Sequence, residues 1–214
     1  MKIFLFTLLF SLPCFSLEVP LVENKWQILK YSKLPPNEIQ FNNNQMHIGV
    51  DKSASPVIFP LDSKGQFKEL QVEGKVQGKL NIKKTPQGSK GNDDFLFRIG
   101  LVYEGDQTLN FFQRIAAPSW VKTLFDLNKD GTGIDRIVFY NTYTDQSLKD
   151  KNREHPASDL IKENFKIALK EDGTFQFQTK IDSSKNVLAI WISSDGDDTD
   201  SKFKVSLEKI NLVK

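Results

Sequence analysis

Apolar and polar residues alternate with a period of two along much of the chain. From Leu70 to Ile82 the even positions are apolar or Gly, and the odd positions are mostly Lys, Glu, Gln or Asn. In DDFLFRIGLVYEG the odd-numbered residues from Phe95 to Tyr103 likewise share one face. This alternation is typical of half-buried strands. Further strands are expected in IDRIVFYN, ENFKIALK, TFQFQTKI and SKFKVSLEKINLV.

The stretch NVLAIWISS is apolar on both faces, which predicts a central strand covered on both sides. Turns are expected where Gly, Pro and Asp gather, and EDGTF between two alternating runs predicts a hairpin. Two short segments have helical features: APSWVKTLFDL, and HPASDLIKEN with Ser158 as its N-cap. The pattern therefore predicts an all-β fold of about ten strands in two packed sheets, forming one domain over residues 17–214.

The first 16 residues, MKIFLFTLLFSLPCFS, have one Lys, an apolar run and a plausible cleavage point after Ser16. This is the pattern of a secretory signal peptide, so we expect an exported protein, periplasmic or extracellular. Pro13 before Cys14 fits a lipoprotein poorly, and the run is short for a membrane anchor. Cleavage would remove the only Cys, so the mature chain would contain no disulfide.

The charges nearly balance, with 29 basic and 27 acidic residues and no basic tail. A general nucleic-acid binder needs clustered positive charge to neutralise phosphates, so the composition argues against that class. The 17 Phe residues are first of all expected in a core, and the same holds for Trp26 and Trp191.

Asp195, Asp197, Asp198 and Asp200 lie within six positions of WISSDGDDTDSKFKV, between two predicted strands. Such a turn can hold Ca²⁺, which takes six to eight oxygen ligands. Asp and Gly also form turns for purely local reasons, and an Arg near the turn would neutralise the carboxylates. Calcium, an Asp–Arg network and a solvated turn are all consistent with the sequence.

A second acidic loop, DLNKDGTGID, places Asp126, Asn128, Asp130 and Gly131 at positions 1, 3, 5 and 6 of an EF-hand loop. Ile137 stands at position 12, where the bidentate Glu belongs, and Asp135 is a possible substitute. The loop is therefore either a weak calcium site or a helix-to-strand turn.

Three stretches resemble a family of uncharacterised exported bacterial proteins, classed as a domain of unknown function. They are KSASPVIFPL, DDFLFRIGLVYEG and AIWISSDGDDTDS, with the shared motifs at Ser53–Pro56, Asn92–Arg98 and Asp195–Thr199. Asn92 departs from the Gly of the family pattern. The resemblance implies a jelly-roll-like β-sandwich in the cell envelope and implies no activity. It also suggests that, if their strands are neighbours, either Arg98 neutralises the Asp195 turn or the acidic ends at Asp93–Asp94 and Asp195–Asp198 share a cation.

Catalytic signatures are weak: the chain has no Gly-x-Ser-x-Gly elbow and few His residues. The sequence therefore favours a non-enzymatic module that binds an extracellular ligand, most plausibly a glycan, at a sheet face or rim. The candidate ligand-binding residues are Arg98, Arg114, Tyr140, Asn141, Arg153 and His155. Two alternatives stay open: a hydrolase or lyase acting on an envelope or extracellular polysaccharide, and a structural envelope protein without a small ligand.

Overall fold

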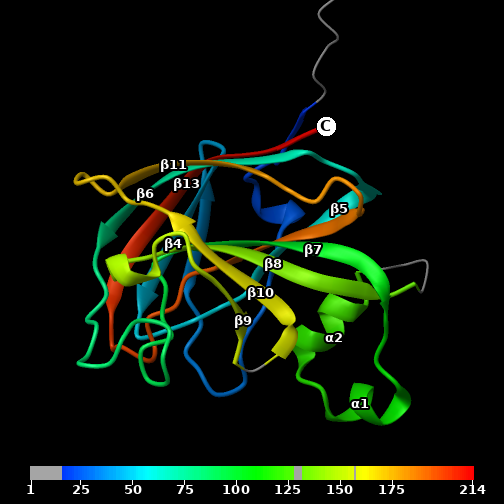
Figure 1. Ribbon diagram of the computed structural model, residues 1–214, viewed down its shortest axis with the longest axis horizontal. Coiled ribbons are helices and arrows are strands. Elements are labelled where there is room, and N and C mark those ends of the chain that lie inside the picture. Colours follow the sequence, from blue (N-terminus) through cyan, green and yellow to red (C-terminus); the bar gives the residue numbers. More distant parts are fainter. Residues whose placement is uncertain (1–15, 128–131, 157) are drawn as a thin grey trace, which may run out of the picture.

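Two layers of strands are packed face to face in the computed structural model, which describes residues 16–127, 132–156 and 158–214 (Figure 1). The six-stranded sheet contains β1 (Ser16–Glu18), β3 (Glu38–Asn42), β4 (Gln45–Asp51), β6 (Glu69–Gly78), β11 (Thr174–Lys180) and β13 (Lys202–Val213). Its order is β11-β6-β13-β4-β3, and β1 pairs with β13. This confirms the predicted all-β sandwich.

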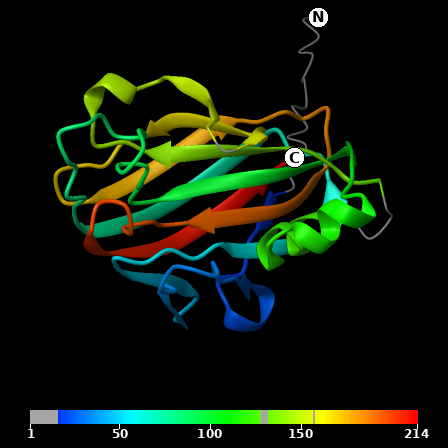
Figure 2. The same ribbon diagram turned by 90° about the horizontal axis from the view of Figure 1, so that it is seen from below.

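The second sheet has seven strands in the order β2-β5-β12-β7-β8-β10-β9. These strands are β2 (Gln27–Ile28), β5 (Val57–Gly65), β7 (Arg98–Gln107), β8 (Ile134–Thr142), β9 (Asn152–His155), β10 (Ser158–Ile167) and β12 (Val187–Ser193). Two helices, α1 (Phe111–Ala116) and α2 (Ser119–Phe125), lie between β7 and β8 in the chain and at one end of the molecule (Figure 2). Two short 3-10 turns, Glu23–Lys25 and Gln146–Leu148, complete the elements.

The main core fills the space between the sheets, and a second apolar cluster covers the outer face of the seven-stranded sheet. Every residue of β12 is buried. Val187, Ile190 and Ile192 face the other sheet, and Leu188 and Trp191 face α2. This confirms the prediction of a central strand that is covered on both sides.

Two local predictions were wrong. HPASDLIKEN contains the last residue of β9, His155, and most of β10 instead of a helix, because β10 pairs in parallel with β8. The Ser158 hydroxyl accepts a bond from the Leu160 N–H two residues on, which is a turn contact rather than a helix cap. EDGTF does form a tight turn with Gly173 at φ 81°, but it joins β10 and β11, which belong to different sheets.

The predicted helix in APSWVKTLFDL is confirmed as α2, with Pro118 at its N-cap and Leu124 buried against the sheet. No helix in the described part of the chain is long and apolar enough to span a membrane. The predicted signal peptide falls on residues 1–16, of which 1–15 lie outside the described residues.

Candidate functional site

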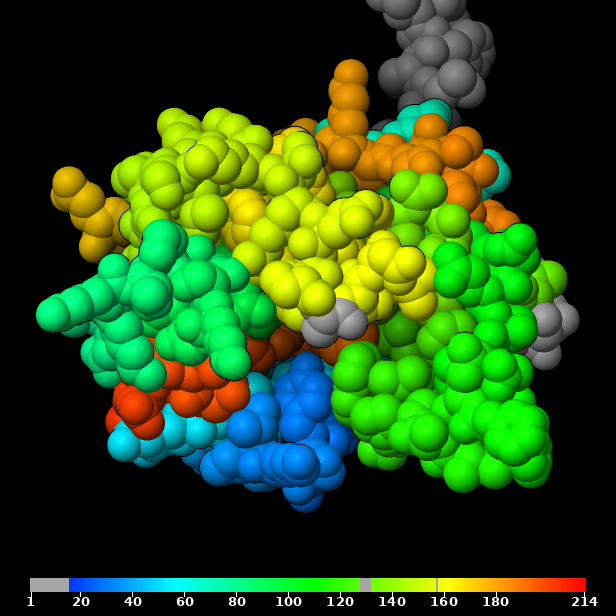
Figure 3. All heavy atoms as spheres, turned by 60° about the horizontal axis from the view of Figure 1, so that its bottom comes forward, coloured from blue at the N-terminus to red at the C-terminus, as the bar shows by residue number. Residues whose placement is uncertain are grey.

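A cleft of about 470 Å³ lies on the outer face of the seven-stranded sheet, beside α2. In Figure 3 the loop after β2 (blue), the α1–α2 segment (green) and the β9–β10 region (yellow) surround this hollow. Four aromatic side chains and four polar ones line it: Tyr31, Trp120, Phe139, Trp191, Arg98, His155, Ser158 and Ser193. Rings and hydrogen-bonding groups thus converge in one concave site, which is the usual composition of a small-molecule site.

The aromatic rings form a continuous floor and wall. Trp191 and Phe139 are buried, with centroids 5.5 Å apart, and form the floor. Trp120 packs edge-on against Trp191 at 5.6 Å, and Tyr31 packs edge-on against Trp120 at 6.0 Å. Both Trp120 and Tyr31 are only half-buried, so parts of their rings stay open to a ligand. The buried indole N–H of Trp191 has no hydrogen-bond partner among the described residues.

Arg98 occupies the polar end of the cleft. It is the first residue of β7, and it pairs in register with Ser193 at the end of β12. The acidic turn follows β12 directly, so the Arg98 Nε donates to Asp195 Oδ2 at 2.8 Å, and Nη2 contacts the same oxygen. Burial lowers the pKa of Arg98, but the carboxylates of Asp195, Glu163 and Asp93 outweigh burial and raise it. Arg98 therefore stays positively charged, and these buried carboxylates balance its charge.

A second arginine extends the network below the cleft. The Arg153 Nε donates to Glu163 Oε2 at 2.7 Å, and its Nη2 donates to Asp93 Oδ1 at 2.7 Å. Glu163 is fully buried and also accepts from Asn141 Nδ2 at 2.8 Å. The ring of His155 lies 3.3 Å from Asp93 Oδ2, so the same carboxylate orients a group that lines the cleft.

The Asp93 carboxyl is held in its charged form by these neighbours. Burial alone would raise its pKa, but the His155 hydrogen bond and the charges of Arg98 and Arg153 produce a net lowering. Each guanidinium also lies over a phenylalanine ring, Arg98 at 4.8 Å from Phe95 and Arg153 at 5.5 Å from Phe165. The two arginines of the network thus pack against the rings of Phe95 and Phe165.

The acidic turn is organised mainly by protein contacts. Asp94 Oδ2 accepts bonds from the Thr199 N–H at 2.7 Å and from the Thr199 hydroxyl at 2.6 Å. Asp195 Oδ1 accepts from the Ser193 hydroxyl at 2.6 Å. Asp195 also accepts the bond from Arg98 described above. The turn therefore contains an Asp–Arg network, which was one of the three interpretations of the sequence.

Asp197 differs from the other carboxylates of the turn. Its side chain has no hydrogen bond to another described residue, and it is half-buried. Burial, together with the charges of Asp94 and Asp195, raises the pKa of Asp197 to about 6. It lines a smaller hollow of about 190 Å³ that shares Tyr31 and Arg98 with the aromatic cleft.

Calcium stays a prediction for both acidic loops. Among the described residues no group of three or more His, Cys, Asp or Glu side chains is arranged to hold a metal ion. Of the four EF-hand-like positions, Asn128, Asp130 and Gly131 lie outside the described residues. Asp126 follows α2 and accepts a bond from Arg114 Nη1 at 2.7 Å.

The structure brings together only some of the predicted ligand-binding residues. Arg98 and His155 line the cleft, and Arg153 and Asn141 support them from below. Tyr140 does not belong to the site, because it points into the core between the sheets and packs on Phe177 at 5.3 Å. Arg114 lies on α1, paired with Asp126, and it does not line the cleft.

Sequence reasoning missed the aromatic wall. Tyr31 comes from a loop, Trp120 from a short helix and Trp191 from a central strand, so no local pattern joins them. The available signal was the unusual Trp120 at the exposed start of a predicted helix. Trp26, as expected, is core and packs on Phe59 at 5.2 Å.

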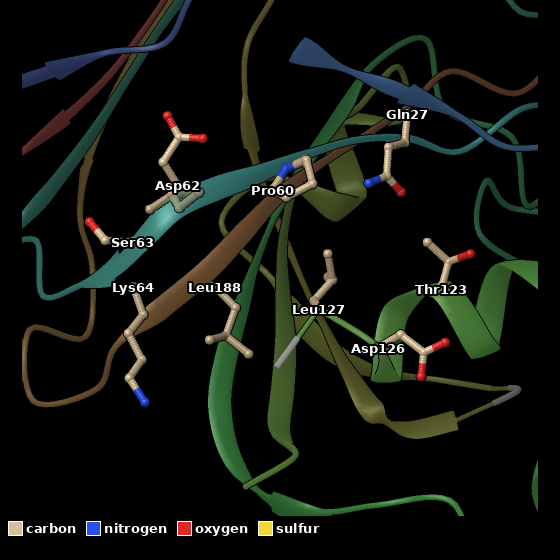
Figure 4. Close-up of a pocket in the computed structure, with 10 residues that line it drawn as sticks. Gln27, Pro60, Asp62, Ser63, Lys64, Thr123, Asp126, Leu127 and Leu188 are labelled. Carbon is tan, nitrogen blue, oxygen red and sulfur yellow. The ribbon is translucent and has the colours of Figure 1, made fainter. Parts of the chain in front are cut away.

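A larger cavity of about 600 Å³ is lined in part by Thr123 of α2 and by Asp126 and Leu127, which follow this helix (Figure 4). None of the described residues that line it is aromatic, and its charged side chains have other partners. Lys64 pairs with Glu104 at 2.6 Å, and Asp62 lies 3.6 Å from Lys25. In Figure 4 Asp62 and Lys64 point in different directions, so these two charged groups do not converge on one position.

No protein-family model matches the chain, and no curated protein matches it. Among solved structures it is similar to the family 11 carbohydrate-binding module of Clostridium thermocellum, solved in complex with a β-1,3-1,4-mixed-linked tetrasaccharide. The two share 10% sequence identity and a TM-score of 0.43, over 92% of this chain and 94% of that one. The fold and site of the present chain define a β-sandwich with an aromatic cleft next to a buried arginine network. What it binds is inferred below from its own side chains.

Proposed function

We propose that this protein is an exported, non-catalytic binding module that takes a glycan in the aromatic cleft. The observation that carries the proposal is the convergence of Tyr31, Trp120 and Trp191 with Arg98 and His155 in one hollow. Sugar rings present apolar C–H faces that pack on aromatic rings, and their hydroxyls need fixed donors and acceptors.

The arginine network supports this proposal because it fixes the polar end before a ligand arrives. Arg98 is held by Asp195 and Glu163, and His155 is held by Asp93. A site whose side chains are already ordered loses less conformational entropy on binding.

The test is a panel of soluble β-glucan, xylan, chitin and peptidoglycan oligosaccharides, with binding followed by tryptophan fluorescence and calorimetry. Trp120→Ala removes one aromatic side of the cleft. We expect the Kd of this variant for the bound oligosaccharide to be about 30-fold higher than that of the wild type, as for the loss of a central aromatic contact. Phe112→Ala is the matched control, because it deletes an exposed ring outside the cleft. Equal affinity of the Trp120→Ala variant and the wild type, or no binding of any panel member, would overturn the proposal.

A hydrolase acting on a polysaccharide is the second candidate, and Asp197 is the observation that favours it. A half-buried carboxyl with its pKa raised to about 6 beside a cleft is suited to act as a general acid. Tyr140 does not support this candidate, because it lies in the core. Release of new reducing ends from the same panel, lost in Asp197→Asn, would replace the binding module by an enzyme.

A further inference from the structure

The helix α1 exposes three large apolar side chains to solvent. Phe111 is 73% exposed, Phe112 79% and Ile115 64%, and no residue of this helix is buried. The other exposed large hydrophobic residues of the described chain, Val22 and Ile28, reach only 39% and 37%. Large apolar groups gathered at one exposed place mark a surface that is covered in function.

This apolar tip, defined as Phe111, Phe112 and Ile115, is held in a fixed shape. Asn110 and Gln113 form a reciprocal capping box at the start of α1. Arg114, within the same helix, pairs with Asp126 after α2 at 2.7 Å. Figure 1 shows α1 projecting from the body of the sandwich. A six-residue helix without core contacts is therefore kept folded by its caps and one ion pair.

The size of the tip argues against a second protein chain as its occupant. Two Phe and one Ile side chain offer roughly 500 Å² at most. A stable protein interface needs about 800 Å² from each partner. The tip is also convex, because its side chains point away from α1 and α1 projects from the body of the sandwich (Figure 1). An occupant that accepts a small convex apolar tip without a matching pocket is a lipid bilayer.

Three lysines lie on α2 and on the loop that contacts it. Lys30 and Lys33 lie in the loop of Tyr31, which contacts Trp120 of α2, and Lys122 lies on α2 itself. None of these three lysines forms an ion pair with another residue of the described chain. Figure 3 shows this loop and the two helices next to each other on one face. Unpaired lysines next to an apolar tip complement an anionic surface.

We propose that the α1 tip inserts into the interfacial region of an anionic lipid bilayer. Phe111, Phe112 and Ile115 would enter the headgroup boundary, and Lys30, Lys33 and Lys122 would stay among the lipid phosphates. The aromatic cleft lies on the same side of the molecule, so docking would bring it close to the membrane surface. The proposal stands apart from glycan binding, because the tip residues do not line the cleft.

The experiment is flotation of the protein, as recovered from expressing cells, with vesicles of phosphatidylcholine and of phosphatidylcholine with 30% phosphatidylglycerol. We expect binding to the anionic vesicles, and a roughly hundredfold weaker partition for Phe111→Ser/Phe112→Ser, because two rings no longer enter the apolar layer. The double variant Val22→Ser/Ile28→Ser is the matched control and should bind like the wild type. Lys30→Gln/Lys33→Gln should weaken binding to the anionic vesicles only.

Three results would overturn the proposal. The wild type could fail to float with either vesicle, or the two serine double variants could bind equally well. Sedimentation equilibrium could instead reveal a dimer that Phe111→Ser/Phe112→Ser dissociates, which would make a second copy the occupant. The tip is exposed, so its variants should keep the wild-type Tm, and glycan binding in the cleft should be unchanged by them.

Discussion

Arg98 is buried together with the carboxylates that neutralise it. Only 12% of its side chain is exposed, with 7% for Asp195 and 0% for Glu163. Removing such charges from water is costly, and the mutual attraction recovers that cost only while every partner is present. The network therefore fixes the geometry of the site, and its individual members are expected to be sensitive to substitution.

Replacing Arg98 with Met should lower the free energy of unfolding by about 3–5 kcal/mol, because Asp195 and Glu163 are left buried without their counter-ion. Urea titration monitored by circular dichroism measures the change. Arg136→Met is the matched control, since its pair with Asp135 is 41% exposed on the Arg side and should contribute less than about 1 kcal/mol. Similar losses for the two variants would show that burial does not set the strength of the Arg98 pairs.

Asp197 should make stability depend on pH in the opposite sense to a paired carboxylate. Its folded-state pKa of about 6 exceeds the ordinary value of 3.8, so the folded protein binds more protons than the unfolded chain between these values. The contribution of Asp197 to stability is therefore lost as the pH rises from about 4 to about 6. Above pH 6 the full penalty of a repelled, half-buried carboxylate remains.

Asp197→Asn should remove that penalty. We expect the variant to match the wild type at pH 4 and to exceed it by about 1 kcal/mol at pH 7–8, as measured by urea unfolding at a series of pH values. Asp200→Asn is the control in the same turn, because Asp200 is exposed and pairs with Lys52 at 3.8 Å. An Asp197→Asn advantage that stays constant from pH 4 to pH 8 would contradict the raised pKa.

At the scale of the elements, close approach between strands depends on glycine. A Cβ added to Gly74 of β6 would lie 2.6 Å from the Ser206 carbonyl of β13 and 2.7 Å from the Phe175 ring. These contacts are shorter than van der Waals distances and lie in the packed core between the sheets. Gly74 therefore lets β6, β11 and β13 pack around the Phe175 ring.

Gly74→Ala should lower the free energy of unfolding by about 1–3 kcal/mol through overpacking. Gly49→Ala on β4 is the control, since its nearest neighbour, Glu38 Cβ, would lie at 3.4 Å. Thermal and urea unfolding of both variants measure the difference. If the Gly74→Ala variant were as stable as Gly49→Ala, the strands around Gly74 would accommodate the added methyl group without loss of stability, and the prediction would be wrong.

The elements that sequence could predict are those whose pattern is local. Alternation along β6 and a doubly apolar β12 mark strands without knowledge of their partners. HPASDLIKEN was misassigned because its pairing with β8 is distant in sequence and overrides local preference. The EDGTF turn was correctly located, but which sheets its two strands join is not encoded in the turn.

The candidate site could be predicted only in part, for the same reason. The partnership of Arg98 with Asp195 was expected if their strands were neighbours, and β7 and β12 are neighbours. Glu163 was not expected, because a single acidic residue in a strand has no local feature that marks it as buried. Tyr140 was misplaced because alternation along β8 directs it inward, next to Phe177.

At the scale of the whole molecule, the seven-stranded sheet separates two environments. Its inner face belongs to the core, and its outer face carries the helices, the aromatic cleft and the apolar tip. Both proposed surfaces thus depend on the segment between β7 and β8, while the six-stranded sheet stabilises the fold from the other side.

The N-terminal boundary of the fold lies close to the proposed signal cleavage site. Ser16 and Glu18 of β1 are exposed, whereas Val19 and Leu21 are each 1% exposed in the main core. The Pro20 carbonyl also accepts the Trp26 indole N–H at 2.9 Å. Cleavage after Ser16 would thus leave the buried part of the N-terminus in place.

A chain that begins at Leu17 should therefore unfold at the same urea concentration as the full chain, within the error of the titration. A chain that begins at Val22 loses two fully buried side chains, and its free energy of unfolding should fall by about 4 kcal/mol or more. The exposed substitution Glu18→Ala in the Leu17 chain is the control for a change at β1 without core loss. If the Leu17 chain were itself destabilised by more than about 1 kcal/mol, residues before Leu17 would belong to the fold. Processing after Ser16 would then be incompatible with a stable mature protein, and the proposal of export through a cleaved signal peptide would have to be abandoned.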